Sequence, residues 1–316
     1  WMELFSIRIR RTFQLVSTQY ADVPAQTGDT EQSPTPIISI ENLDNYIHDN
    51  KVSVKDLYLQ ISSMGNEKPD IVEGNDLPDF NPDDEYLQEI KSPIFYAVQK
   101  NINIQTGQPT ILDFDMQRIS QRINIVFNIR TEGNIKREDL AAPIIELSGA
   151  CGRFNIADAC LDTTRLYRMA HQVQPDEFTQ TGEGTYRCVV HFHTLGVIPS
   201  AAKGHLNGPG ILQVALQVST PQLDSSGAPV VDEEGNPVKN SRYIYGAINP
   251  YDELTAAQLI EVRDGKIYLR YSKEDVNIEI TTPLVIKADQ IVPNDTGMGW
   301  QPHDPTNPDD DIIIEI

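Results

Sequence analysis

The sequence predicts an all-β protein with two domains and one short helix in the second. Apolar and polar residues alternate with period two in most segments, which places one face of each segment against a core. Gly and Pro bound these segments, as is usual for the short strands of β-sandwiches. The 316 residues exceed the ~150 expected of a single domain, so we expect domains at 1–115 and 116–316.

Strand patterns begin near the N-terminus. The first covers Phe5–Leu15, where apolar side chains at alternate positions share one face. The passage Asp22–Pro36 is rich in Pro, Thr and Gln and has too few apolar residues to pack, so we expect an exposed loop. Further strands of the first domain are expected at Pro36–Ile40, Val52–Ile61, Ile94–Val98, Ile102–Ile104 and Ile111–Met116.

The second domain is expected to open on the strand Arg122–Arg130, whose apolar side chains alternate without interruption. Asp224 and Asp232 each begin a turn-rich run, DSSGAPV and then DEEGNPV. Turn residues at this density predict a protruding hairpin tip. The remaining strands of this domain are expected at Pro143–Gly149, Thr185–Gly196, Gly210–Thr220, Lys266–Ser272 and Asp275–Ile291.

One helix is expected in the run YDELTAAQLIEVRDGK, near Thr255–Val262. Acidic residues at its start suit the positive end of a helix dipole, and Ala and Leu fill its body. The Asp-Gly pair that follows is a typical stop signal.

The last residues, DIIIEI, alternate as a strand does. Ile312, Ile314 and Ile316 share one face, so we expect them to pair with a sheet and fill a hydrophobic groove. Two partners remain open: the strand completes its own second domain, or it is donated to a neighbouring subunit.

Charge and hydropathy exclude several classes of protein. The net charge of −21, from 46 acidic and 25 basic residues, repels a phosphate backbone, so nucleic acid is not an expected partner. No apolar stretch approaches the ~18 to 20 residues of a membrane-spanning helix. The start, WMELFSIRIRR, lacks the apolar core of a signal peptide, and we expect the numbering to begin after a removed targeting segment.

We expect neither a metal site nor a cofactor. The acidic passage Asp76–Tyr86 offers carboxylates for calcium, but it lacks the spacing of an EF-hand loop and is interpreted as a solvated loop. His191 and His193 share one strand face without a third ligand nearby, which indicates exposed strand histidines. Cys188 is expected to be a buried apolar residue. Cys151 and Cys160 are close enough in sequence to pair in an oxidising compartment.

No short catalytic motif occurs. The sequence has no GxGxxG, no GxxxxGK[ST], no GxSxG and no HExxH. Paired carboxylates on a sandwich, as in glycosidases, would leave no such motif. We therefore expect a non-enzyme, and keep as the alternative a carbohydrate-binding or carbohydrate-processing surface protein, which exposed aromatic residues beside paired carboxylates would favour.

From about Ser92 onward the order of segments resembles that of Bacteroidales fimbrillin-type proteins, including anchor and accessory fimbrial subunits. The segments that carry the resemblance are SPIFYAVQKNINI, QRINIVFNI, PIIELSGACGRFNI, EDVNIEITTPLVIK and GMGWQPHDPTNPDDDIIIEI. These are strand patterns, which are less specific than a catalytic signature.

The resemblance implies two transthyretin-like β-sandwich domains in a lipoprotein exported to the outer membrane surface. It also implies assembly into a fimbrium by strand exchange with other fimbrial subunits, and a host or bacterial surface receptor as a further partner. Membrane attachment would be through a lipid anchor, but the sequence has no lipobox cysteine to carry it.

Overall fold

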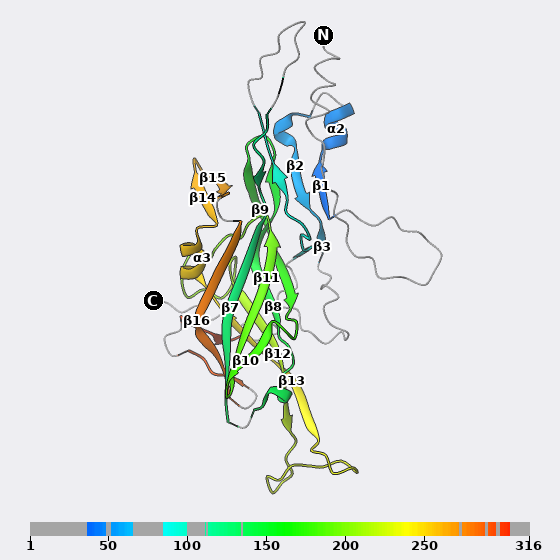
Figure 1. The fold of residues 1–316 in the computed structure, drawn as a ribbon, viewed down its shortest axis with the longest axis vertical. Helices are drawn as coiled ribbons and strands as arrows, with labels where there is room; N and C mark the ends of the chain where they lie inside the picture. Colours follow the sequence, from blue (N-terminus) through cyan, green and yellow to red (C-terminus); the bar gives the residue numbers. More distant parts are fainter. Residues whose placement is uncertain are drawn as a thin grey trace, which may run out of the picture.

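The computed structural model of the protein describes residues 37–48, 52–65, 85–99, 111, 113–133, 135–271, 274–287, 290–294 and 298–303. Within them the fold is all-β, as the sequence predicts, and two sheets pack face to face around one large core (Figure 1). The predictions for Phe5–Leu15, Ile102–Ile104 and DIIIEI lie outside the described residues, as does most of the acidic passage Asp76–Tyr86.

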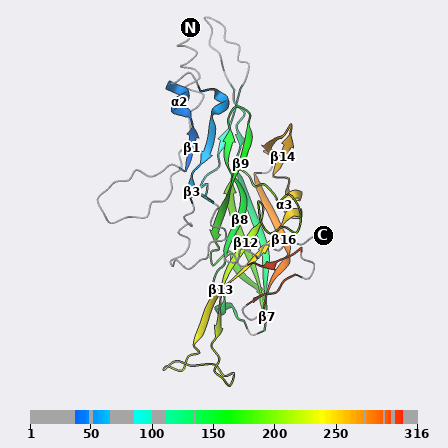
Figure 2. The same cartoon turned by 180° about the vertical axis from the view of Figure 1, so that it is seen from behind.

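The larger sheet has 11 strands, in the order β14-β15-β9-β8-β12-β13-β18, with β1 to β4 joined to it through β8 and β9. Figure 2 shows the molecule turned by 180°, with the side of this sheet toward the viewer. Its strands are β1 (Ile38–Glu41), β2 (Tyr58–Ile61), β3 (Ser63–Gly65), β4 (Tyr86–Leu87), β8 (Ile144–Asn155), β9 (Cys160–Gln172), β12 (Leu212–Pro221), β13 (Lys239–Ile248), β14 (Ile260–Arg263), β15 (Lys266–Leu269) and β18 (Gln301–Pro302).

The smaller sheet has five strands in the order β10-β11-β7-β16-β17. They are β10 (Phe178–Gly182), β11 (Thr185–Thr194), β7 (Gln121–Glu132), β16 (Asp275–Lys287) and β17 (Gln290–Ile291). A separate pair joins β5 (Phe95–Tyr96) to β6 (Gln117–Arg118). Two single-turn 3-10 helices, Val54–Asp56 and Arg137–Asp139, connect strands.

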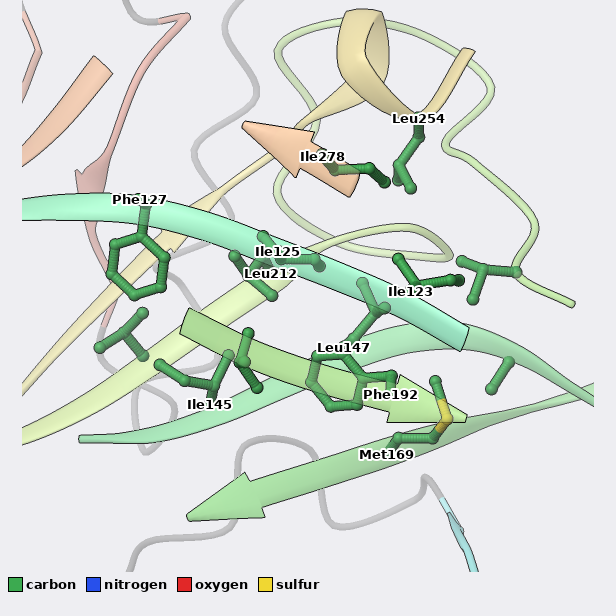
Figure 3. Close-up of a cluster of buried hydrophobic side chains, with 14 of the residues drawn as sticks. Ile123, Ile125, Phe127, Ile145, Leu147, Met169, Phe192, Leu212, Leu254 and Ile278 are labelled. Carbon is green, nitrogen blue, oxygen red and sulfur yellow. The ribbon is translucent and has the colours of Figure 1, made fainter. Parts of the chain in front are cut away.

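The predicted strand Arg122–Arg130 is confirmed as the central part of β7. The alternation places one face of this strand in the core and the other outward, as predicted. The buried residues are Ile123, Ile125, Phe127 and Ile129. β7 pairs antiparallel with β11 and parallel with β16. Figure 3 shows its inward side chains against Ile145 and Leu147 of β8 and Leu212 of β12, so this strand anchors the interface between the two sheets.

The strands before residue 116 are not separate from the larger sheet. β2 pairs with β8 from Tyr58↔Asn155 onward, and β4 pairs with β9 at Tyr86↔Arg168. The Tyr86 hydroxyl also donates to the buried Glu146 carboxylate on β8, at 2.7 Å. The boundary expected between residues 115 and 116 stays a prediction, since these contacts show only that the N-terminal strands extend the same sheet.

The helix near Thr255–Val262 is misplaced. The structure has α3 at Tyr251–Ala257, ending at Gln258 in the left-handed conformation, and residue 262 lies in β14. Asp264 and Gly265, read from sequence as a helix stop, both have positive φ and turn β14 into β15. Asp-Gly is a preferred pair for such a hairpin turn. A second short helix, α2 (Leu43–His48), was not predicted.

Several other expectations need correction. Within Val52–Ile61 only β2 is a strand, and residues 113–116 are not in a strand, because β6 begins at Gln117. The strand expected at Ile94–Val98 shrinks to β5. The strands that were not predicted are β3, β4, β6, β9, β10, β13, β14 and β18.

Candidate interaction sites

Among the described residues, an open strand edge and a small polar pocket are two features that offer a site to a partner. The edge belongs to β13. On one side β13 pairs with β12 along its whole length, from Pro221↔Lys239 to Leu212↔Ile248. On the other side β18 pairs only with Gly246 and Ala247. No other described strand lies beside residues 239–244, so most of this edge is open within the described part of the chain.

The segment that occupies the end of this edge is firmly anchored. Trp300 is only 1% exposed, its ring centroid lies 5.1 Å from that of Phe127, and its Nε1 donates to the Thr282 carbonyl at 3.0 Å. The His303 amide then donates to the Tyr245 carbonyl at 3.1 Å, which extends the β18–β13 ladder by one step. The chain is thus held at the point where the open edge begins.

The open edge has a polar rim and an apolar patch behind it. Lys239 to Arg242 are exposed, and the Lys239 ammonium binds the Asp139 carboxylate at 2.7 Å. Tyr243 and Tyr245 stack with ring centroids 6.3 Å apart and pack on Ile144 and Ala215. Charged residues on an edge strand disfavour indiscriminate pairing, whereas the apolar patch gives a matching strand something to cover.

Beyond this edge, β12 and β13 continue into the predicted hairpin tip, which protrudes from the end of the molecule (Figure 1). The two similar runs form two similar turns. Asp224 Oδ1 accepts from the amides of Ser226 and Ala228 at 2.8 and 3.0 Å, and Asp232 Oδ1 accepts from those of Glu234 and Asn236 at 2.9 and 2.8 Å. A hydrogen bond from the Ser226 hydroxyl, together with the amide hydrogen bonds, lowers the pKa of Asp224, and the amide hydrogen bonds lower that of Asp232. The internal echo in the sequence is therefore a pair of turns within one arm.

The edge of β16 is closed in a different manner. Beyond its short pairing with β17, no described strand lies along the outer edge of β16, and α3 packs there instead. Leu254 of α3 is buried and lies beside Ile278 in Figure 3. Leu254 thereby packs α3 onto β16.

The pocket lies where α3 begins. It has a volume of about 180 Å³ and is lined by polar groups from four separate stretches, among them Lys203, Asn249, Tyr251, Asp252, Glu253 and Thr282. The Lys203 ammonium binds the Asp252 carboxylate at 2.5 Å. Sequence reasoning missed this site, because no short motif connects residues that lie so far apart in the chain.

His191 and His193 share one face of β11, as predicted, but both are half-buried rather than exposed. His191 Nδ1 lies 2.6 Å from Asn124 Oδ1, and His193 Nε2 lies 2.9 Å from Ser120 Oγ. Burial and the nearby Arg118 charge lower the pKa of His193 to about 4. Each histidine therefore has its own hydrogen-bond partner, and the two do not converge.

One carboxylate that sequence reasoning missed lies beside this face. Glu177 accepts from His171 Nε2 at 2.9 Å and from the Gln174 amide at 2.7 Å, and lies 3.6 Å from His191 Nε2. These hydrogen bonds and the two histidines lower the pKa of Glu177 against the opposing effect of burial. Over the described ranges, no group of three or more His, Cys, Asp or Glu side chains has a geometry that would hold a metal ion.

The cysteines are all buried and free. Cys188 lies in the core between Tyr186 and Val190 on the inner face of β11, as predicted. Cys151 and Cys160 do not form the disulfide that the sequence left open. Burial raises the pKa of the Cys151 thiol to about 12, so it is a weak nucleophile.

Two further expectations meet the described residues only in part. Of the acidic passage, Glu85 and Tyr86 are described, and the Glu85 carboxylate pairs with Arg165 and accepts from Ser63 Oγ at 2.7 Å. None of the helices in the described ranges has the length and apolar composition needed to cross a membrane.

Comparison with known proteins identifies no family for this chain. No protein-family model matches the chain, and no curated protein matches its sequence. Among solved structures, "a putative adhesin from Bacteroides ovatus" is similar over 81% of this chain and 72% of its own, with 11% sequence identity and a TM-score of 0.35. A likeness this weak carries no argument, and we draw no conclusion from it.

Proposed function

We propose that the protein is an exported structural or adhesive subunit of a cell-surface fimbria that assembles through β-strand exchange. The observation that carries the proposal is the edge of β13. β18 pairs with this edge at Gly246 and Ala247, but no described strand pairs with it along residues 239–244. The resemblance of the sequence to fimbrillin-type proteins supports the same class.

A strand added beside Lys239–Ile244 would gain both of the contributions that strand addition offers. Main-chain hydrogen bonds would continue the ladder past the His303–Tyr245 bond, and side chains on one face would cover the stacked Tyr243 and Tyr245. We assign this role to the terminal run with Ile312, Ile314 and Ile316 of a neighbouring subunit. Alternation of apolar side chains is what such an added strand requires.

The partners and location follow from that role. Other fimbrial subunits are the primary partners, with a host or bacterial surface receptor as a further one, and the outer membrane surface is the location. In this proposal the protein has no catalytic role, no cofactor and no nucleic acid partner. The net charge of −21 supports the exclusion of nucleic acid.

The test compares two serine variants of the terminal run. The triple variant Ile312→Ser, Ile314→Ser, Ile316→Ser changes the face assigned to pairing, while Ile313→Ser is the matched control on the opposite face. Burial of each isoleucine is worth ~1.5 to 3 kcal/mol, so the triple variant removes several kcal/mol from whatever contact the run makes.

If the strand is donated, the triple variant keeps the melting temperature of the monomer but does not form fibres, and the control assembles normally. A lower melting temperature of the triple variant as a monomer would show that the strand pairs within its own chain, which contradicts donation. No change in either stability or assembly would mean that the isoleucines pair with nothing.

A further inference from the structure

We propose that Pro305 keeps the edge of β13 open for a neighbouring subunit, because it prevents the chain from pairing its own residues 304–316 along that edge. These residues, here called the tail, follow β18 and lie outside the described residues. The identity of the incoming strand rests on the proposed function, whereas the block at Pro305 is a property of the monomer. The register of β18 on β13 determines where each residue of the tail would meet the edge.

The backbone hydrogen bonds of this edge fall at every second residue. In an antiparallel pair, residues that exchange backbone hydrogen bonds alternate with residues that do not. The His303 amide donates to the Tyr245 carbonyl at 3.1 Å, so these two residues form a bonded pair. Pro302 lies opposite Gly246, between bonded pairs. The edge therefore already accommodates a proline at a position where no backbone N–H is required.

The same register would place Pro305 at the next bonded position. Two residues beyond the Tyr245–His303 pair on each strand, Tyr243 would face Pro305. Proline has no backbone N–H, so it cannot donate to the Tyr243 carbonyl, and its ring takes the space where that hydrogen would point. The ladder would thus lose its bond at the first bonded step beyond the described segment. The tail would meet this cost before it gained any further pairing along residues 239–244.

The isoleucines of the tail cannot compensate for the lost bond in this register. Counted on from the pair that His303 forms, Lys239 would face residue 309, and β13 begins at Lys239. The isoleucines of residues 312–316 would then lie beyond the start of β13, beside the arm. A strand from a neighbouring subunit is not tied to the register of β18. Its isoleucines can lie beside the edge itself.

The edge itself is formed and ready to receive that strand. β13 pairs with β12 down to Lys239, and the alternation set by the His303 bond directs the backbone groups of Tyr243, Ser241 and Lys239 away from β12. No described residue pairs with these three on that side. The terminal run DIIIEI contains no proline, so each of its residues can offer an N–H opposite Tyr243.

Amide hydrogen exchange on the full chain as a monomer tests the block. Pro305→Thr restores the N–H opposite Tyr243 with a residue that suits a strand. Pro308→Thr is the matched control, because residue 308 would face Asn240 between bonded pairs, as Pro302 faces its own partner. The Tyr243 amide is the probe, since it points to the open side of the edge.

We expect the Tyr243 amide to exchange readily in the wild type and in Pro308→Thr, and about fivefold more slowly in Pro305→Thr, which corresponds to about one backbone hydrogen bond. Fibre assembly of Pro305→Thr should need a roughly fivefold higher protein concentration, because its own tail occupies the edge in part of the molecules.

The proposal is overturned if the Tyr243 amide is already protected in the wild-type monomer, or if the two variants exchange alike. It is also overturned if Pro305→Thr is protected but assembles as the wild type does. If the exchange rates are as expected and the wild type forms no fibres, the fimbrial proposal fails while the block at Pro305 stands.

Discussion

Trp300 should be one of the most important side chains for stability, because it closes the sandwich beside the open edge of β13. Its ring is 1% exposed and packs on Phe127. Truncation of a buried Trp to Ala costs about 3 to 5 kcal/mol through lost packing and a residual cavity. The Thr282 carbonyl also loses its indole donor, which adds about 1 kcal/mol or more. We therefore expect Trp300→Ala to lower the free energy of unfolding by about 4 to 6 kcal/mol.

Urea denaturation followed by far-UV circular dichroism measures this loss, with an unchanged m-value showing that the variant still unfolds as one unit. Trp300→Phe is the matched control, because it keeps an aromatic ring against Phe127 while losing the N–H group and a smaller part of the buried ring volume. Its cost should be about 1 to 3 kcal/mol. A loss below about 1 kcal/mol for Trp300→Ala, or equal losses for the two variants, would refute the reasoning that the 298–303 segment is anchored through this ring.

Two further predictions concern buried and half-buried charge. Arg168→Ala should lower the free energy of unfolding by about 3 to 5 kcal/mol in denaturant titration, because it removes the cation 3.4 Å from the buried Glu146 carboxylate. The double variant Arg168→Met, Glu146→Leu removes both charges and should lose less stability. An equal or larger loss in the double variant would contradict this account. Burial and the Arg118 charge lower the pKa of His193 to about 4 in the folded protein, whereas the same histidine has a pKa near 6.5 in the unfolded chain. Between these two values the unfolded chain binds more protons, so the free energy of unfolding should decline as pH falls from about 6.5 to 4. His193→Gln should flatten that decline, and the exposed control His205→Gln should leave it unchanged; the same slope in both would contradict the assignment.

The strands that sequence reasoning predicted best are those with one face in the core and one in water. β7 is such a strand, and its alternation from Ile123 to Ile129 gives its position and its inward face without further information. β9 was missed because it does not alternate in this way. Arg168 and Tyr167 are consecutive and both buried, and Arg168 binds the buried side chains of Glu146 and Gln213, which belong to other strands. A charged side chain buried by a distant segment leaves no pattern in its own strand.

The helix was misplaced because of the backbone conformation of one residue, whereas the pocket was missed because it depends on tertiary packing. The run that begins at Tyr251 has helix-forming composition, but Gln258 adopts a left-handed conformation that ends the helix one turn before Val262. The pocket needs Asn249 and Thr282 to come together, and only the packing of α3 against β16 achieves this. The position of Asn249 also depends on the hydrogen bonds that it donates to the carbonyls of Ala202 and His205, more than forty residues away in sequence.

The central claim is that the open edge of β13 receives a strand from another subunit, and hydrogen exchange of its backbone amides measures this directly. The amides of residues 239–244 that do not face β12 should exchange readily in the monomer and become protected when the protein assembles, because a new ladder then covers them. The edge strand β14, at Ile260–Arg263, is the internal control and should not change. If exchange along residues 239–244 is the same before and after assembly, this edge is not where subunits join, and the account is contradicted.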